Sequence, residues 1–189
     1  MLYRLSNFLV YCFSKLFCEL KIEGREAIPK LGPFILASNH LSNLDPIFLV
    51  IGSPRKVGFL AKEELFKNKL AILYLKDVGA IPLKRGKSDI KAMRLALKTL
   101  KVKPLLVFPQ GTRGESFEVT NNGVGFLCKK AGVPVIAARI YGTDKVFSKG
   151  VRLFHKSKVR VIFAQVDNIE KADSYANIAQ KVISKIANL

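Results

Sequence analysis

The sequence predicts a single α/β domain in which helices flank a central sheet. From Pro33 onward, short apolar runs rich in β-branched residues alternate with stretches of helical periodicity, as expected when helices join the strands of a sheet. The chain has 189 residues, of which 49% are apolar, so it can build one sizeable core. Because no Pro- or Ser-rich linker interrupts this pattern, we expect one catalytic or binding unit.

The expected elements follow from the spacing of apolar residues. The candidate strands are Phe34–Ala37, Val57–Ala61, Ala80–Leu83, Leu105–Phe108, Val133–Ile140 and Val159–Phe163. Ser88 is a candidate cap for a helix whose apolar residues are Ile90, Met93, Leu97 and Leu100. A closing helix is predicted from a core-packing stripe of Tyr175, Ile178, Val182, Ile186 and Leu189.

The charge balance predicts an anionic partner. Lys and Arg number 32 against 14 Asp and Glu, a net charge of +18, and the high apolar content excludes general disorder. A nucleic acid, an acidic membrane or a phosphorylated substrate would each fit. Between residues 84 and 103, eight basic residues face only Asp89, which favours a surface for a polyanion or an anionic leaflet over a merely solvated helix face.

The cysteines and histidines limit the redox and metal chemistry. The chain has 3 Cys and 2 His, and Cys12, Cys18 and Cys128 have no CxxC spacing. We therefore expect a reducing compartment and no metal site.

Residues 1–20 predict an amphipathic helix that lies at a membrane interface. The longest uncharged run, Leu5–Ser14, has ten residues, too few for the ~20 that span a bilayer. Its apolar face is widened by Phe8, Tyr11 and Phe17, which favours interfacial contact. A signal peptide is one alternative, but the sequence shows no cleavage site after the apolar stretch. The other alternative is a helix that packs its apolar face on the domain's own core. Residues 21–189 form the remaining domain.

A loop of nine residues, 38–46, follows the first predicted strand and contains a candidate acid–base pair. We expect Asp45 to cap a helix whose first residue is Pro46, so His40 and Asp45 can face each other. A carboxylate beside an imidazole fixes its tautomer and stabilises its protonated form, as a general base requires. On spacing alone, however, a helix cap and an ordinary loop histidine explain the two residues better.

A second loop has the composition of a phosphate cradle. The strand Leu105–Phe108 runs into a turn that contains Gly111, Thr112 and Arg113. Glycine permits close backbone approach, threonine can donate a hydrogen bond, and arginine matches a phosphate with two donors. Arg85, which follows the strand Ala80–Leu83, could reach the same anion.

Together these blocks resemble the glycerolipid acyltransferase family typified by bacterial 1-acylglycerol-3-phosphate acyltransferase. The family's NHxSxxD motif is matched by Asn39, His40, Ser42 and Asp45. Its GxIPxxR motif is matched by Gly79, Ile81, Pro82 and Arg85, and its FPEGTR motif by Phe108, Pro109, Gly111, Thr112 and Arg113. Val133–Ile136 resembles its VPVxP strand, and residues 61–65 resemble its AKxEL segment.

The resemblance implies a mixed, largely parallel sheet and a set of roles. His40 would be the general base and Asp45 would orient it, while Arg85 and Arg113, with Gly111 and Thr112, would bind the acceptor phosphate. The residues expected to position the acceptor are Asn39, Ser42, Gln110 and Lys62. No cofactor is implied, since acyl-CoA or acyl carrier protein serves as a co-substrate. Gln110 stands where the family usually has Glu, which puts contacts to the acceptor's hydroxyls in question.

The function predicted from these motifs is acyl transfer from a thioester to the sn-2 hydroxyl of 1-acylglycerol 3-phosphate, which yields phosphatidate. We expect an enzyme on the cytoplasmic face of a membrane, peripheral or monotopic, that binds an anionic lipid surface. Another lysophospholipid or glycerol 3-phosphate is the alternative acceptor. A non-catalytic nucleic-acid-binding protein is the alternative of a different class, but the cations are not interleaved with aromatics as in a known RNA-binding module.

Overall fold

The computed structural model describes residues 18–67, 69–83, 90–111, 113–114, 122–146 and 156–189. The strands are β1 (Cys18–Glu23), β2 (Ile35–Ser38), β3 (Gly58–Lys62), β4 (Ile81–Leu83), β5 (Leu105–Val107), β6 (Val135–Tyr141) and β7 (Ser157–Gln165). The α-helices are α2 (Asp45–Gly52), α3 (Lys69–Val78), α4 (Ile90–Thr99), α5 (Gly123–Ala131), α6 (Thr143–Val146) and α7 (Tyr175–Ala187). Short 3₁₀ turns occur at Arg25–Ala27 and Glu63–Lys67.

The strands form one seven-stranded sheet in the order β1-β7-β6-β2-β5-β3-β4. Strands β2 to β6 are parallel to one another, whereas β7 is antiparallel to β6 and parallel to β1. The predicted α/β domain with a mixed, largely parallel sheet is therefore confirmed. Because the five parallel strands share one direction, the loops that follow them meet at one edge of the sheet.

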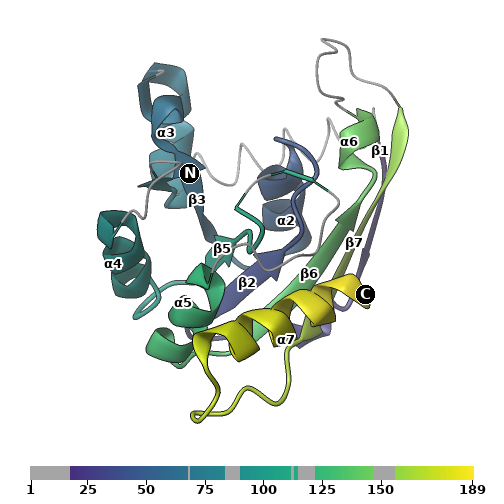
Figure 1. Cartoon of the computed structure of the whole chain (residues 1–189). Helices are drawn as coiled ribbons and strands as arrows, with labels where there is room; N and C mark the ends of the chain where they lie inside the picture. Colours follow the sequence, from purple (N-terminus) through teal and green to yellow (C-terminus); the bar gives the residue numbers. More distant parts are fainter. Residues whose placement is uncertain (1–17, 68, 84–89, 112, 115–121, 147–155) are drawn as a thin grey trace.

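Two apolar layers cover the sheet, one on each face. Helices α2 and α3 pack on one face, where Phe48 and Leu75 belong to the same apolar cluster as Leu36 of β2. Helices α4, α5 and α7 lie on the other face, where their buried residues form a second cluster that includes Ile35 of β2, and Figure 1 shows α7 crossing this face. Side chains of successive strand residues point to opposite faces, so each buried strand contributes to both layers.

The first strand differs from the sequence prediction. Cys18, Glu19 and Leu20, which the sequence analysis assigns to the amino-terminal helix, begin β1. Strand β7 supplies backbone partners for all of β1, and Leu20 and Ile22 pack on the core while Glu19 is exposed, an alternation of period two. The rest of the predicted helix lies outside the described residues.

An ion pair joins β1 to β7 at the surface. Two of the guanidinium nitrogens of Arg160, Nε and Nη2, donate to the Glu23 carboxylate at 2.7 and 2.9 Å. These bonds lower the pKa of Glu23 to about 2, so the pair stays charged throughout the neutral range.

The apolar stripe predicted for α7 agrees with the structure better than the one predicted for α4. In α7, the stripe is confirmed, with Ile178, Val182 and Ile186 buried. Of the residues predicted for the apolar stripe of α4, Ile90 is 60% exposed, and Leu100, which directly follows the helix, is buried. The buried stripe of α4 is centred on Ala92 and Ala96, whose small side chains allow close packing, and Ile90 is left at its margin.

Close packing of α5 against α7 requires a glycine. A Cβ at Gly125 would lie 1.9 Å from the carbonyl oxygen of Tyr175, so Gly125→Ala must push the helices apart. We expect a loss of about 3 kcal/mol in the free energy of unfolding, measured by urea denaturation. Gly132→Ala is the control, because Gly132 has open space but a φ of +61°, which costs about 1 kcal/mol. Equal losses in the two variants would contradict this packing.

Candidate active site

The loops after β2, β5 and β6 meet at the carboxyl edge of the sheet. They bring together His40 and Asp45, Gln110, and Thr143, and all four side chains are buried. An isolated β-bridge between His40 and Gly114 joins the first two loops. The contact between Asp45 and Thr143, for example, joins residues that are 98 positions apart in the sequence.

His40 and Asp45 face each other, as the resemblance of the motifs led us to expect and as their spacing allows. His40 Nδ1 lies 2.8 Å from Asp45 Oδ2, and Asp45 is fully buried. An ionised carboxylate only accepts hydrogen bonds, so this contact favours the neutral tautomer with its proton on Nδ1, which puts the ring's lone pair on Nε2. This is the tautomer that a base acting through Nε2 requires.

Asp45 is not the helix cap that the sequence predicts. It is the first residue of α2, Leu44 occupies the cap position, and Pro46 follows within the first turn. The carboxylate points back over the preceding loop, where its Oδ2 accepts the backbone N–H groups of Leu41 and Ser42 at 2.5 and 2.8 Å. Asp45 therefore folds the loop onto itself and holds the imidazole at the same time.

The His40 backbone and ring are held by the β5 loop. The backbone N–H of His40 donates to Gln110 Oε1 at 3.0 Å, and the backbone carbonyl of His40 accepts from Gly114 N at 2.9 Å. Gln110 Nε2 donates to the Gly114 carbonyl at 3.4 Å, while the Phe108 ring stacks on the imidazole at 4.1 Å between centroids. The Gln110 amide thus joins both loops, and a carboxylate could not make the donation to Gly114.

The side-chain amide of Asn39 takes the place of a backbone hydrogen-bonding partner beyond the end of β2. Its Nδ2 donates to the Ile140 carbonyl and its Oδ1 accepts from the Ile140 N–H, both at 2.8 Å. This continues the pairing of β2 with β6 by one residue. Ser42 is also used within its loop, where its Oγ accepts from Leu44 N at 3.3 Å.

The predicted phosphate-binding residues are described only in part. Gly111 has a φ of +68° and donates to the Phe108 carbonyl at 3.0 Å, which turns the chain sharply after β5. Arg113 is exposed beyond this turn, and Lys62 is half-buried at the end of β3. Arg85 and Thr112 lie outside the described residues.

Sequence reasoning missed Thr143. Its Oγ1 donates to Asp45 Oδ1 at 2.5 Å, and the side chain is fully buried. The available signal was a Gly-Thr pair that directly follows the last parallel strand, at the edge where ligands bind.

The two thiols in the described part of the chain are poor candidates for a nucleophile. Cys18 and Cys128 are unpaired and buried, and burial raises the pKa of Cys128 to about 12, so its reactive thiolate is rare at neutral pH. Within the ranges that the structure describes, no cluster of three or more His, Cys, Asp or Glu residues could hold a metal ion.

Comparison with known proteins identifies the family. A family model described as Acyltransferase matches residues 19–141, which include the His40–Asp45 pair and the Gln110 loop. The chain belongs to the acyltransferase family. The expected family and type of enzyme are thereby confirmed.

Several acyltransferases of known name are similar to this one. The 1-acyl-sn-glycerol-3-phosphate acyltransferase of Bacillus subtilis is 28% identical over 148 residues, which are 77% of this chain and 72% of the Bacillus protein. The chloroplastic enzyme BAT2 of Brassica napus is 27% identical over 92% of this chain and 52% of its own length. The crystal structure of PlsC, the 1-acyl-sn-glycerophosphate acyltransferase of Thermotoga maritima, superposes with a TM-score of 0.79 and 29% identity, covering 99% of this chain and 77% of that one.

The contacts of Asn39 predict a loss of stability rather than of acceptor binding. Asn39→Ala leaves both polar backbone groups of the buried Ile140 without their partner, and we expect it to cost about 2 to 3 kcal/mol of unfolding free energy. Asn177→Ala, on the exposed surface of α7, should change it by less than about 0.5 kcal/mol. If Asn39→Ala raised only the KM for the acceptor and left urea unfolding unchanged, the acceptor-positioning role expected from the resemblance would be the better account.

Proposed function

We propose that this acyltransferase moves a fatty acyl group from an acyl thioester to the sn-2 hydroxyl of 1-acylglycerol 3-phosphate, which gives phosphatidate. The single observation that carries the proposal is the buried His40–Asp45 pair, joined through Nδ1 so that Nε2 can act as the base, at the edge of the sheet where Arg113 is exposed. The names of the relatives from Bacillus and Thermotoga support this choice of acceptor.

The reaction needs only a positioned base. His40 Nε2 takes the proton of the acceptor hydroxyl, and the oxygen attacks the thioester carbonyl. The new C–O bond forms, the C–S bond breaks, and the leaving thiolate receives the proton from the imidazolium. Asp45 stabilises the imidazolium between these two proton transfers. Because Ser42 Oγ is bonded within its loop, no covalent enzyme intermediate is part of this proposal.

The acceptor phosphate is proposed to bind cations at the same edge. Arg113 extends from the loop that carries Gly111, and Arg85 and Thr112 are proposed to join it on the basis of their motifs. Lys62 ends β3, a further parallel strand at this edge. Arginine suits this role because its two parallel donors match phosphate oxygens.

Gln110 bears on the choice of acceptor. Its amide is engaged by His40 N and Gly114 O, and it adds no second carboxylate beside the base. Since the family usually has Glu here, another lysophospholipid or glycerol 3-phosphate is the second candidate acceptor. Assaying acyl-CoA and acyl carrier protein donors against these acceptors decides the substrate pair, and a preference for glycerol 3-phosphate over its 1-acyl derivative would overturn the leading proposal.

The assignment of the base makes a direct prediction. His40→Ala should lower kcat at least about 10²-fold, in line with the usual contribution of a general base, while urea unfolding stays cooperative. The control is His155→Ala, because His155 is the only other histidine, and it should keep activity within about threefold. Comparable losses in the two variants, or substantial transfer by His40→Ala, would remove His40 from this role.

Arg113→Ala separates binding of the phosphate from catalysis. We expect the KM for the phosphorylated acceptor to rise about 10-fold or more, because charge-assisted hydrogen bonds are lost, with the KM for the donor unchanged. The two KM values are obtained from initial rates measured at varied concentrations of acceptor and donor. A loss of cooperative unfolding with no specific effect on the acceptor would indicate a structural arginine.

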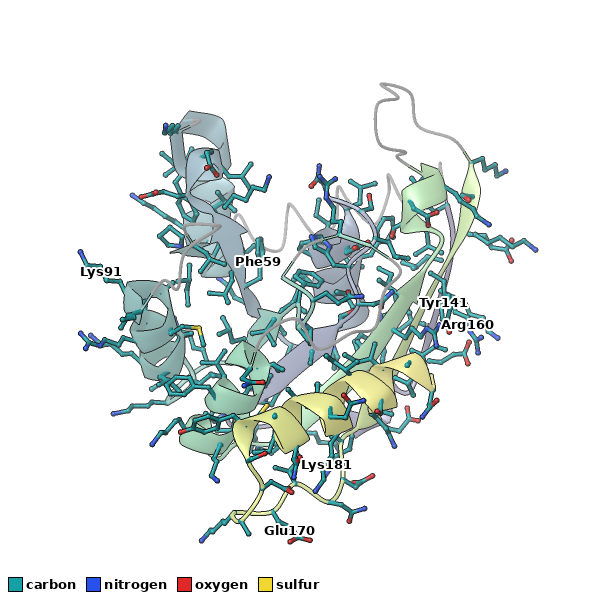
Figure 2. All side chains as sticks on the ribbon, in the orientation of Figure 1. Phe59, Lys91, Tyr141, Arg160, Glu170 and Lys181 are labelled. Carbon is teal, nitrogen blue, oxygen red and sulfur yellow. The ribbon has the colours of Figure 1, made fainter. Side chains whose placement is uncertain are left out.

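We propose that the enzyme works as a peripheral protein at the cytoplasmic face of an anionic membrane. Helix α4 and the turn after it carry the exposed basic residues Lys91, Arg94, Lys98, Lys101 and Lys103, and Lys91 projects away from the sheet (Figure 2). Exposed apolar side chains lie among them, namely Ile90, Leu95 and Val102. Mixed basic and apolar surfaces of this kind suit lipid interfaces. No helix within the described ranges is long and apolar enough to cross a bilayer.

Charge reversal on α4 tests this surface. Lys91→Glu with Lys98→Glu should weaken binding to vesicles that contain phosphatidylglycerol by about 10-fold or more, since each cation near an anionic leaflet is worth about 1 kcal/mol. The matched control, Lys130→Glu with Lys171→Glu, reverses two lysines that are also exposed, on α5 and before α7. It should bind the vesicles within about threefold of the unmodified protein. If co-sedimentation showed that both double variants bind the vesicles equally weakly, the effect would come from net charge and not from the surface of α4.

A further inference from the structure

We propose that Thr143 is a positioning residue for acyl transfer, acting through Asp45 on the base His40. Its hydroxyl fixes one oxygen of the Asp45 carboxylate so that the other oxygen faces the imidazole. This inference rests on the proposed function of His40, and none of the sequence motifs includes Thr143.

The two oxygens of Asp45 have separate partners. Oδ2 accepts from His40 Nδ1, Leu41 N and Ser42 N, whereas Oδ1 accepts from Thr143 Oγ1 at 2.5 Å. Asp45 and Thr143 are both fully buried, so water cannot readily replace the hydroxyl. Without it, a buried anionic oxygen loses a charge-assisted bond and the carboxylate gains freedom to rotate.

The turn at Gly142 positions the Thr143 hydroxyl beside Asp45. Gly142 has a φ of +80°, and a Cβ there would lie 2.0 Å from the Lys158 carbonyl oxygen. Only glycine allows β6 to turn this close to β7 and then enter α6. Thr143 is the first residue of α6, and this turn carries its hydroxyl to the Asp45 carboxylate.

A second contact fixes β6 relative to the histidine loop. Asn39, the neighbour of His40, bonds both backbone groups of Ile140, three residues before Thr143. These two bonds tie the end of β6 to the loop that carries His40. Because the Thr143 side chain is fully buried and bonded to Asp45, its hydroxyl is held relative to the carboxylate.

The role can be tested by varying the hydroxyl alone. Thr143→Val keeps the shape and removes the oxygen, whereas Thr143→Ser keeps the oxygen and removes the methyl group. We expect Thr143→Val to lower kcat about 10- to 100-fold, part of what a well-positioned base contributes, with the KM for donor and acceptor within about twofold. Thr143→Ser should restore kcat to within about threefold of the unmodified enzyme. Thr99→Val, in α4, is the control and should leave kcat unchanged.

Thr143→Ala provides a second comparison in case the valine variant fails to fold. Alanine and serine differ only by the hydroxyl oxygen, so a kcat of the alanine variant about 10-fold or more below that of the serine variant supports the proposal. Equal kcat values for these two, or a raised KM with unchanged kcat, would overturn it. His40→Ala is assayed alongside. If that variant stays active, the proposed function fails, whereas an inactive His40→Ala with a fully active Thr143→Ala refutes the positioning role alone.

Discussion

A fully buried carboxylate, that of Asp45, is the constraint on which the site depends. An ionised group without water must find its hydrogen bonds in the protein, since an unpaired buried charge costs several kcal/mol. Four donors meet this need, from the His40 ring, the backbone of Leu41 and Ser42, and the Thr143 hydroxyl. The same bonds that keep the charge stable thus fix the tautomer and direction of the imidazole.

The topology of the sheet makes this cluster of donors possible. Parallel strands β2, β5 and β6 end at one edge, so loops distant in sequence arrive together. Asn39 bonds to Ile140 at the end of β6, and Gln110 bonds to His40 from the β5 loop. Each loop is therefore held by its neighbour, and the apolar layers on both faces of the sheet need only supply a rigid support.

The sequence predicts the local part of this arrangement and misses the long-range part. Strands β2 to β7 follow from the periodicity of the apolar residues. A spacing of five residues lets His40 and Asp45 face each other, but only the resemblance of the motifs favoured the pair over a helix cap and an ordinary loop histidine. Strand β1 was missed because its alternation of apolar residues is short and is stabilised by pairing with the distant β7. The partners of Asn39 and Asp45 on β6 and α6 lie 101 and 98 residues away, and such contacts leave no periodic trace in the chain.

The most direct test of the account is the tautomer of His40. In protein labelled with ¹⁵N at histidine, and with His155 replaced by Gln to leave one signal, ¹⁵N NMR at a pH where the ring is neutral distinguishes the two nitrogens. The account predicts a proton on Nδ1, bonded to Asp45, and an unprotonated Nε2. A neutral ring with its proton on Nε2 would contradict it, because Nε2 would then have no lone pair to accept the proton of the acceptor hydroxyl.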